Sequence, residues 1–331
     1  MPPPPFAITL EEHAAFPSLG SDLPFYNVLW KVFPETRRGL VDHSTGRIAS
    51  MDEGHISYQI MSHLPGMCND RPEDCRKAND EMAEAIKKNP SRLGGFAALP
   101  MAHPDKAAAE LERAVKELGF LGAMIDSHLA DMTHYDGERF WPVFEAAERL
   151  DVPLYIHPGP PSESVMKERF GGNYSDFIMQ GLSTAIWGWH EDVGLHVLKL
   201  YSAGVFERFP KLKIIIGHMG EMLPMMIDRV EQFLNLFQKS GSVRFNDVWD
   251  RNIWVTSSGM FSVRVLEMLL KVTKKDHVLY SIDTPFNKSL EGRTYIQELA
   301  DKSSLSKEDL DDFAFGNAKK LFKLDLALKR F

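Results

Sequence analysis

Cysteine is scarce in this chain of 331 residues, which contains only Cys68 and Cys75. Two cysteines are too few for a disulfide framework, and this favours a reducing compartment. The sequence has no apolar run of the about 18 residues that a membrane span needs. Its start, Met-Pro-Pro-Pro-Pro-Phe, lacks the basic segment and apolar stretch of a secretory signal. These absences predict a soluble, cytoplasmic protein with no membrane partner.

Basic residues are also in deficit, with 38 Lys and Arg against 46 Asp and Glu and a net charge of −8. A negative balance argues against a nucleic-acid partner or an anionic membrane surface. Internal linkers, low-complexity tracts and short repeats are missing too. We therefore expect one domain over residues 1–331.

Short apolar segments alternate along the chain with stretches of helical periodicity. Strands are predicted over residues 6–11, 55–62, 92–99, 120–126, 152–156, 214–216, 253–257 and 277–282. Helices are predicted over residues 72–88, 104–118, 137–150, 187–206, 223–238, 263–272, 295–301 and 307–329. Residues 14–50 are expected to be an irregular insertion, and residues 159–186 a second one that contains glycine and proline.

Eight strands alternating with helices predict an α/β fold of the (β/α)8 TIM-barrel type, with two insertions and C-terminal helices. A doubly wound open sheet is the alternative. Such sheets often carry a glycine-rich phosphate-binding turn after the first strand. Here the first strand runs into Glu11-Glu12-His13, with no glycine.

Polar side chains stand at the ends of the predicted strands: Glu11, His13, His157, His218 and Asp283. In a closed barrel these strand ends meet at one rim, where barrel enzymes carry their active sites. Imidazoles with carboxylates suit a divalent ion such as Zn²⁺, Mn²⁺ or Mg²⁺. Taken singly, each residue has a structural interpretation, such as a packed histidine, a turn aspartate or a solvated glutamate. Together they predict a metal site.

Several segments, spread over nearly the whole chain, resemble the amidohydrolase superfamily. The resemblance is narrowest to the branch that contains aminocarboxymuconate-semialdehyde decarboxylase and the o-hydroxybenzoate decarboxylases for γ-resorcylate, 2,3-dihydroxybenzoate and salicylate. The matching motifs are L-E-E-H (10–13), R-L-G-G-F-A-A-L-P (92–100), E-L-G-F-L-G-A (117–123), D-V-P-L-Y-I-H-P (151–158), F-P-K-L-K-I-I-I-G-H-M-G-E (209–221), S-I-D-T-P-F (281–286) and G-N-A-K-K-L-F-K-L (316–324).

The resemblance implies one divalent metal ion, most simply zinc, with magnesium or manganese as alternatives. Glu11, His157 and Asp283 would bind this ion, with His13 as a fourth ligand. It also implies that the protein forms a homodimer or homotetramer.

The same resemblance assigns catalytic roles beside the metal. His218 would hydrogen-bond the substrate or a metal-bound oxygen, and Glu221 would orient His218. Arg229 matches an arginine of the family, and we expect Arg229, Phe286 and Trp187 to contact the substrate.

The chain departs from the family pattern at three places near the expected pocket. Thr284 stands where the family has tyrosine, Asp228 stands where tryptophan is frequent, and the run W-G-W-H at 187–190 differs from the relatives. These changes affect which aromatic acid is bound more than the type of chemistry.

The resulting hypothesis is a reversible, non-oxidative decarboxylation of an ortho-hydroxylated aromatic acid, in which Asp283 protonates the ring carbon that carries the carboxyl group. One alternative is a metal-dependent hydrolase of an amide or lactone on the same barrel. Another is a barrel that binds a small aromatic molecule without converting it.

Overall fold

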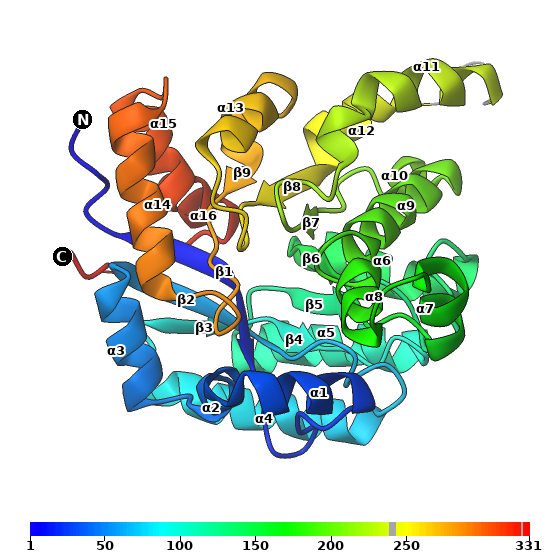
Figure 1. Cartoon of the computed structure of the whole chain (residues 1–331), viewed down its shortest axis with the longest axis horizontal. Helices are drawn as coiled ribbons and strands as arrows, with labels where there is room; N and C mark the ends of the chain where they lie inside the picture. Colours follow the sequence, from blue (N-terminus) through cyan, green and yellow to red (C-terminus); the bar gives the residue numbers. More distant parts are fainter. Residues whose placement is uncertain (238–242, 326) are drawn as a thin grey trace.

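The computed structural model describes residues 1–237, 243–325 and 327–331 (Figure 1). All strand pairs in it are parallel. The strands are β1 (Ala7–Ala14), β2 (Ile56–His63), β3 (Leu93–Gly95), β4 (Ala97–Ala98), β5 (Ala123–Asp126), β6 (Leu154–His157), β7 (Ile214–Ile216), β8 (Ile253–Thr256) and β9 (Val278–Leu279).

The strands follow one another in chain order across two sheets, β1-β2-β3 and β4-β5-β6-β7-β8-β9. Only Phe96 separates β3 from β4. Beyond β9 the chain returns to β1 through a parallel bridge between Glu12 and Thr284. Because every neighbouring pair is parallel, the carboxyl ends of the strands lie at the same edge.

Helices connect the strands and surround them in Figure 1, where α11 projects away from the body, the N-terminus lies beside α15 and α14, and the C-terminus lies next to the upper end of α3. The helices of the first half are α1 (Pro24–Val32), α2 (Pro34–Val41), α3 (Thr45–Glu53), α4 (Pro72–Lys88), α5 (Pro104–Leu118), α6 (Trp141–Leu150), α7 (Glu163–Phe170) and α8 (Asp176–Ser183). Those of the second half are α9 (Gly188–Ser202), α10 (Val205–Arg208), α11 (Ile227–Phe237), α12 (Phe245–Asn252), α13 (Val263–Val272), α14 (Ser289–Lys302), α15 (Lys307–Asp311) and α16 (Asn317–Leu321). Short 3-10 helices lie at Glu138–Phe140 (η1), Leu223–Met225 (η2) and Lys275–His277 (η3), and a wider π-helical turn lies at Asp312–Gly316 (η4).

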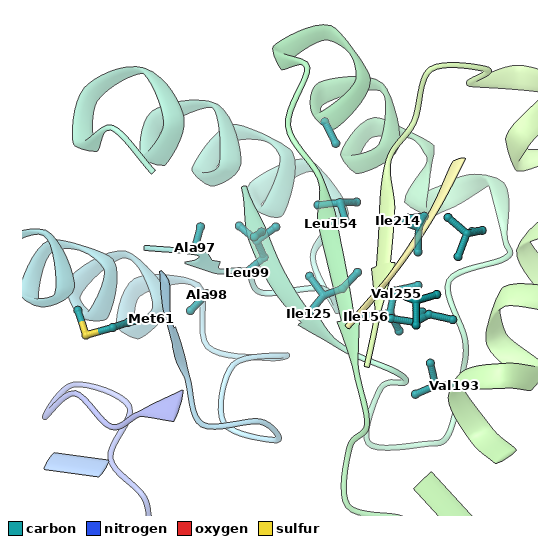
Figure 2. Close-up of a cluster of buried hydrophobic side chains, with 14 of the residues drawn as sticks. Met61, Ala97, Ala98, Leu99, Ile125, Leu154, Ile156, Val193, Ile214 and Val255 are labelled. Atoms are coloured by element: carbon teal, nitrogen blue, oxygen red, sulfur yellow. The ribbon is translucent and has the colours of Figure 1, made fainter. Parts of the chain in front are cut away.

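Most strand residues are buried and many are apolar, and helices pack against the sheets. All three isoleucines of β7 are fully buried, which explains the run of β-branched residues. Figure 2 shows Leu154 and Ile156 of β6 beside Ile214 and Val255 of the next two strands. This packing keeps the strand ends, and the side chains that follow them, in fixed relative positions.

Residues 14–50 differ most from the sequence-based expectation, which was an irregular insertion and is wrong. Helices α1, α2 and α3 occupy most of this segment, and α1 and α2 both start at a proline. Proline favours the first helical turn, where its missing N–H costs nothing. Scattered aromatic residues concealed the helical pattern; Tyr26 and Trp30 of α1 are buried four residues apart on one face.

Other boundaries shift as well. The second insertion contains α7 and α8, and α12 was not expected at all. The helix predicted over 307–329 ends at Leu321, the one predicted over 295–301 starts earlier, at Ser289, and the strand predicted over 277–282 is reduced to β9. Residue 238, the predicted end of a helix, lies outside the described residues. Among the residues that the structure describes, no helix is long and apolar enough to cross a membrane.

Candidate metal centre and active site

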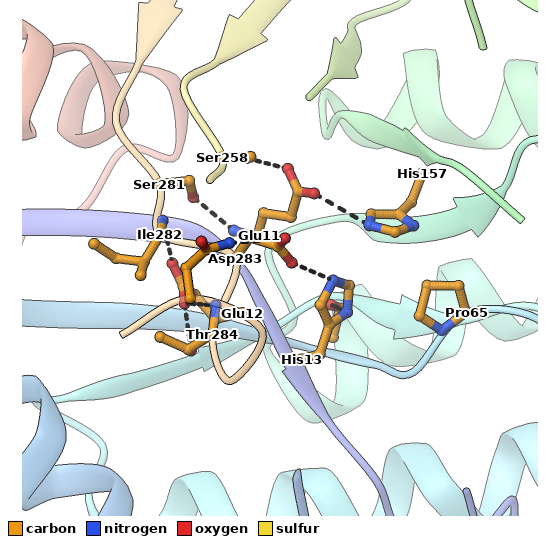
Figure 3. Close-up of polar contacts among 12 residues, drawn as sticks. Glu11, Glu12, His13, Pro65, His157, Ser258, Ser281, Ile282, Asp283 and Thr284 are labelled. Carbon is orange, nitrogen blue, oxygen red and sulfur yellow. Dashed lines mark hydrogen bonds and ion pairs between the residues drawn. The ribbon is translucent and has the colours of Figure 1, made fainter. Parts of the chain in front are cut away.

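Four side chains from three places in the chain gather at one point of the strand ends (Figure 3). Glu11 and His13 lie two residues apart on β1 and therefore point to the same side of the strand. His157 ends β6, and Asp283 follows β9. One ligand atom of each side chain lies within 4.8 Å of the others. The convergence that the sequence predicted for these four residues is present.

Two atoms at the centre of this cluster, Glu11 Oε1 and His13 Nε2, are buried and have no hydrogen-bond partner among the described residues. Glu11 Oε1 lies 3.1 Å from His157 Nε2, and His13 Nε2 lies 3.2 Å from Asp283 Oδ1. Because His157 Nδ1 donates to the carbonyl of Pro158 at 2.8 Å, the lone pair of its Nε2 faces the cluster. A buried oxygen and a buried ring nitrogen that make no hydrogen bond, next to two further ligand types, fit a divalent metal ion.

A hydroxyl cage holds the second carboxylate oxygen of Glu11. Tyr155 and Ser258 both donate to Glu11 Oε2, and the Thr256 hydroxyl lies 3.3 Å from it. A Cβ at Gly217 would lie 2.9 Å from this oxygen, so only glycine leaves room there. Burial opposes ionisation of Glu11, but the nearby imidazoles outweigh it and hold its pKa below the ordinary value. Glu11 is therefore held as a carboxylate with Oε1 directed at the cluster.

Glu12 points to the other side of β1 and forms hydrogen bonds to the segment that carries Asp283. Its carboxylate accepts hydrogen bonds from the backbone N–H of Ile282 and of Thr284, each at 3.0 Å, and from the Thr284 hydroxyl at 2.5 Å. Asp283 N also donates to the Glu11 carbonyl at 3.0 Å. The threonine that replaces the family tyrosine thus braces the chain that presents Asp283.

His218 lies directly beside the cluster, with its Nε2 3.7 Å from Glu11 Oε1. Its Nδ1 donates to Glu221 Oε1 at 2.8 Å, and the other oxygen of Glu221 accepts from His190 Nδ1 at 2.6 Å. Burial lowers the pKa of His218, but the charges of Glu221 and Glu11 raise it overall, to about 10. Burial likewise opposes ionisation of Glu221, whose pKa the two histidines lower to about 2.

The backbone that carries His218 and Glu221 is a left-handed turn rather than the start of a helix. His218, Met219, Glu221 and Met222 all have φ between 46° and 64°, a region that costs residues with a side chain roughly 1–2 kcal/mol each. The first helical turn begins only at Leu223. Glu221 therefore lies in this turn and not in the first turn of a helix. Unfavourable backbone of this kind concentrates at functional sites.

A cavity of about 820 Å³ opens in front of the cluster, and His157, His218 and Asp283 line it. Much of the remaining wall is apolar and comes from α1 and from residues 177–189, including Phe25, Trp30, Phe177, Ile178 and Trp189. An apolar cavity with a few convergent polar groups is typical of a small-molecule site. This lining suits a hydrophobic ligand with one polar end.

The three predicted substrate contacts have different surroundings. Phe286 lines the cavity and packs edge-on against His13, with ring centroids 5.6 Å apart. Trp187 is half exposed, and its Nε1 donates to Glu191; within the described residues, Trp189 rather than Trp187 lines the cavity. Arg229 is exposed on α11, with its guanidinium 4.1 Å from the Phe233 ring centroid. Substrate contact by these residues stays a prediction.

Sequence reasoning missed two residues that hold the site together. Tyr155 lies two positions before His157 on β6, and this spacing alone places both on one face. His190 is part of the W-G-W-H run, and nothing in the sequence connects it with Glu221, 31 residues later.

Comparison with known proteins is consistent with this site. The model of the family described as amidohydrolase matches residues 46–324. The chain belongs to the amidohydrolase family. It is 43% identical over 330 residues to the decarboxylase orsB of Emericella nidulans, covering 97% of this chain and 98% of that protein. It is 35% identical to the gamma-resorcylate decarboxylase of Polaromonas sp., covering 96% and 98% of the two chains.

A solved structure gives the same fold. The dihydroxybenzoic acid decarboxylase of Polaromonas sp. JS666, crystallised with manganese and the inhibitor 2-nitroresorcinol, superposes with a TM-score of 0.85 at 32% identity, over 97% of this chain and 98% of that one. The α/β architecture of our chain is therefore that of the amidohydrolase decarboxylases.

Proposed function

We propose that this protein is a metal-dependent decarboxylase of ortho-hydroxylated aromatic acids, a carboxy-lyase of the amidohydrolase family. One observation carries the proposal: a buried cluster of two imidazoles and two carboxylates, with unpaired atoms at its centre, faces an apolar cavity. The hydroxybenzoate decarboxylases among its relatives support the choice of substrate class.

The proposed metal ligands are Glu11, His13, His157 and Asp283. An ion held by these four residues would supply Lewis-acid polarisation to a substrate bound beside it. The sequence favoured zinc, while the manganese of the Polaromonas structure supports manganese. Metal analysis of the native protein decides between them.

Asp283 is the proposed acid. Its carboxylate faces the cavity next to the cluster, so after taking a proton from the substrate's hydroxyl it can pass that proton to the ring carbon that bears the carboxyl group. That carbon then forms a C–H bond, the bond to the carboxyl carbon breaks, and CO₂ leaves with no change of oxidation state in the enzyme. Excess CO₂ drives the same path in reverse, as carboxylation.

His218 and the aromatic side chains of the cavity wall are proposed to orient the substrate. The charges of Glu221 and Glu11 keep a proton on His218 despite its burial, and its Nε2 lies where a substrate oxygen would approach the cluster. Phe286 and Trp189 supply flat apolar surface for the ring. The substrate's phenol and carboxylate would thus meet the polar end of the cavity.

We further propose that the strands close into one (β/α)8 barrel that forms a single domain over residues 1–331. The one-residue gap at Phe96 and the bonds that join β1 to the segment after β9 support closure; His13 N, for example, donates to the Thr284 carbonyl at 2.7 Å. The predicted homodimer or homotetramer draws support from exposed apolar side chains on and before α11, Met225, Leu236 and Phe237.

Incubation of the metal-loaded protein with salicylate, 2,3-dihydroxybenzoate and 2,6-dihydroxybenzoate tests the function directly. Release of CO₂ with formation of the corresponding phenol is the expected result. If none of these acids loses CO₂ while an amide or lactone takes up water, the protein is instead a hydrolase of the same family.

A further inference from the structure

The carboxylate of Glu221 is held between two histidines that come from different elements. Glu221 Oε1 accepts from His218 Nδ1 at 2.8 Å, and Glu221 Oε2 accepts from His190 Nδ1 at 2.6 Å. The two imidazole rings lie edge to face, with centroids 5.0 Å apart. Because Glu221 is only 1% exposed, water does not compete for either oxygen.

His190 is fixed at both of its nitrogens. Its Nε2 lies 3.0 Å from the carbonyl oxygen of Ala185, in the segment that lines the cavity. Both partners of His190 are hydrogen-bond acceptors, and each faces one of the two ring nitrogens. The ring can neither flip nor rotate without losing one of these bonds.

Helix α9 approaches the turn closely enough for His190 to reach the carboxylate. Gly194 lies one helical turn after His190 and therefore on the same face of α9. A Cβ at Gly194 would lie 2.9 Å from the backbone carbonyl oxygen of Glu221, so glycine permits this close contact. The left-handed backbone of Glu221, with φ of 52°, does not by itself hold the carboxylate in one orientation.

We propose that His190 is a positioning residue for the reaction. It holds the carboxylate of Glu221 so that Oε1 faces His218 Nδ1, and this sets the direction in which His218 Nε2 points toward the metal cluster. His190 transfers no proton and touches no reacting atom in this scheme. The proposal rests on the decarboxylase function proposed above.

Two substitutions of His190 separate its two hydrogen bonds. The side-chain amide of asparagine places a donor near the position of Nδ1, whereas that of glutamine reaches the position of Nε2. His190→Asn should keep the bond to Glu221 and most of kcat. His190→Gln should keep only the bond to Ala185 and lose roughly 10- to 100-fold in kcat, as expected for a hydrogen bond to a charged group, with KM little changed.

The opposite order of activities in the two His190 variants overturns the proposal. If His190→Gln keeps its activity and His190→Asn loses it, His190 serves only to anchor Ala185. Equal loss in both variants with a matching fall in melting temperature assigns His190 a purely structural role and also contradicts the proposal. His103→Gln, at an exposed histidine that pairs with Asp70, is the matched control and should leave kcat unchanged.

A double-mutant cycle tests whether His190 acts through Glu221. In a Glu221→Gln background, His190→Gln should cost little further activity, whereas additive losses would refute the coupling.

A measurement without turnover distinguishes failure of this inference from failure of the function. In metal-free protein with ¹⁵N-labelled histidine, the side-chain nitrogen shifts of His218 should change in His190→Gln and stay at their wild-type values in His190→Asn. If wild type decarboxylates no aromatic acid but the shifts behave as expected, His190 positions His218 and the proposed decarboxylase function is wrong. If wild type turns over and the shifts do not respond to His190→Gln, the positioning role is wrong.

Discussion

Replacement of Asp283 by asparagine is the sharpest test of the proposed mechanism. Asparagine has nearly the same shape as aspartate and retains an oxygen that can bind metal, but it has no acidic proton to give. Asp283 has a φ of +69°, a left-handed conformation that asparagine also tolerates well. The backbone bond from Asp283 N to the Glu11 carbonyl is unaffected by the change. We therefore expect a folded, metal-binding protein.

The expected fall in kcat follows from the loss of one function, general acid catalysis by Asp283. General acid catalysis contributes typically about 10²- to 10⁴-fold, so kcat should fall by at least that range while KM changes little. Asp283→Ala is a poorer test, because alanine at this φ adds a backbone cost of roughly 1–2 kcal/mol to the loss of the acid.

The assay combines CO₂ release under saturating substrate with metal content per chain. Asp151→Asn is a matched control: Asp151 also has a left-handed φ, of 57°, but lies outside the cavity and pairs with Lys213 and Lys323 at the surface. Its substitution should leave kcat unchanged and cost at most about 1 kcal/mol of stability. A metal-loaded Asp283→Asn enzyme with near-normal kcat would show that Asp283 is not the acid.

Three further predictions concern the metal and the buried polar groups. Tyr155→Phe removes a donor to the Glu11 carboxylate and should weaken metal binding by about 10- to 100-fold in chelator competition. The control is Tyr280→Phe, which removes a hydroxyl with no partner among the described residues and should leave metal affinity unchanged. Equal metal affinity in both variants would contradict the role of the hydroxyl cage around Glu11. Removal of the metal from the loaded protein should lower its unfolding free energy, by about 2.7 kcal/mol if the free ion was at a hundredfold excess over Kd. In calorimetry, Tm should fall on removal and return when Mn²⁺ or Zn²⁺ is added. An unchanged Tm would argue against a metal site. Burial lowers the pKa of His63 from 6.5 to about 4, and its Nε2 accepts from Phe16 N, so the folded state disfavours the proton and loses stability as pH falls through this range. The advantage of wild type over His63→Gln in unfolding free energy should shrink by about 2 kcal/mol between pH 7.5 and pH 5, and a constant advantage in denaturant titrations would show that His63 is not buried as a neutral ring.

The order of the elements and the residues of the metal cluster could be predicted because both depend on local sequence patterns. A run such as Ile214–Ile216 is apolar on both faces only where a strand is covered on both sides. A polar residue directly after such a strand lies at the rim. Glu11, His13, His157 and Asp283 each lie at or just after the end of a predicted strand, so their convergence followed from the strand order.

The helices of residues 14–50 could not be predicted in the same way. Their amphipathic pattern is short and interrupted by prolines: α1 and α2 bury only Tyr26, Trp30 and Leu40, and α3 buries only Arg47 and Met51. Short helices of this kind gain their stability from packing on the rest of the fold rather than from their own sequence. The same holds for α7 and α8 of the second insertion.

What the sequence determined by itself was the alternation of strand and helix, and hence which side chains stand at the rim, because these follow from the period of the apolar residues. The tertiary structure alone decided which partners those side chains meet. Tyr155 and Ser258 on Glu11, Thr284 on Glu12 and His190 on Glu221 are separated in the chain by 31 to 272 residues. Hydrogen bonds over such separations depend on how helices and strands pack in three dimensions, and no local pattern records that packing.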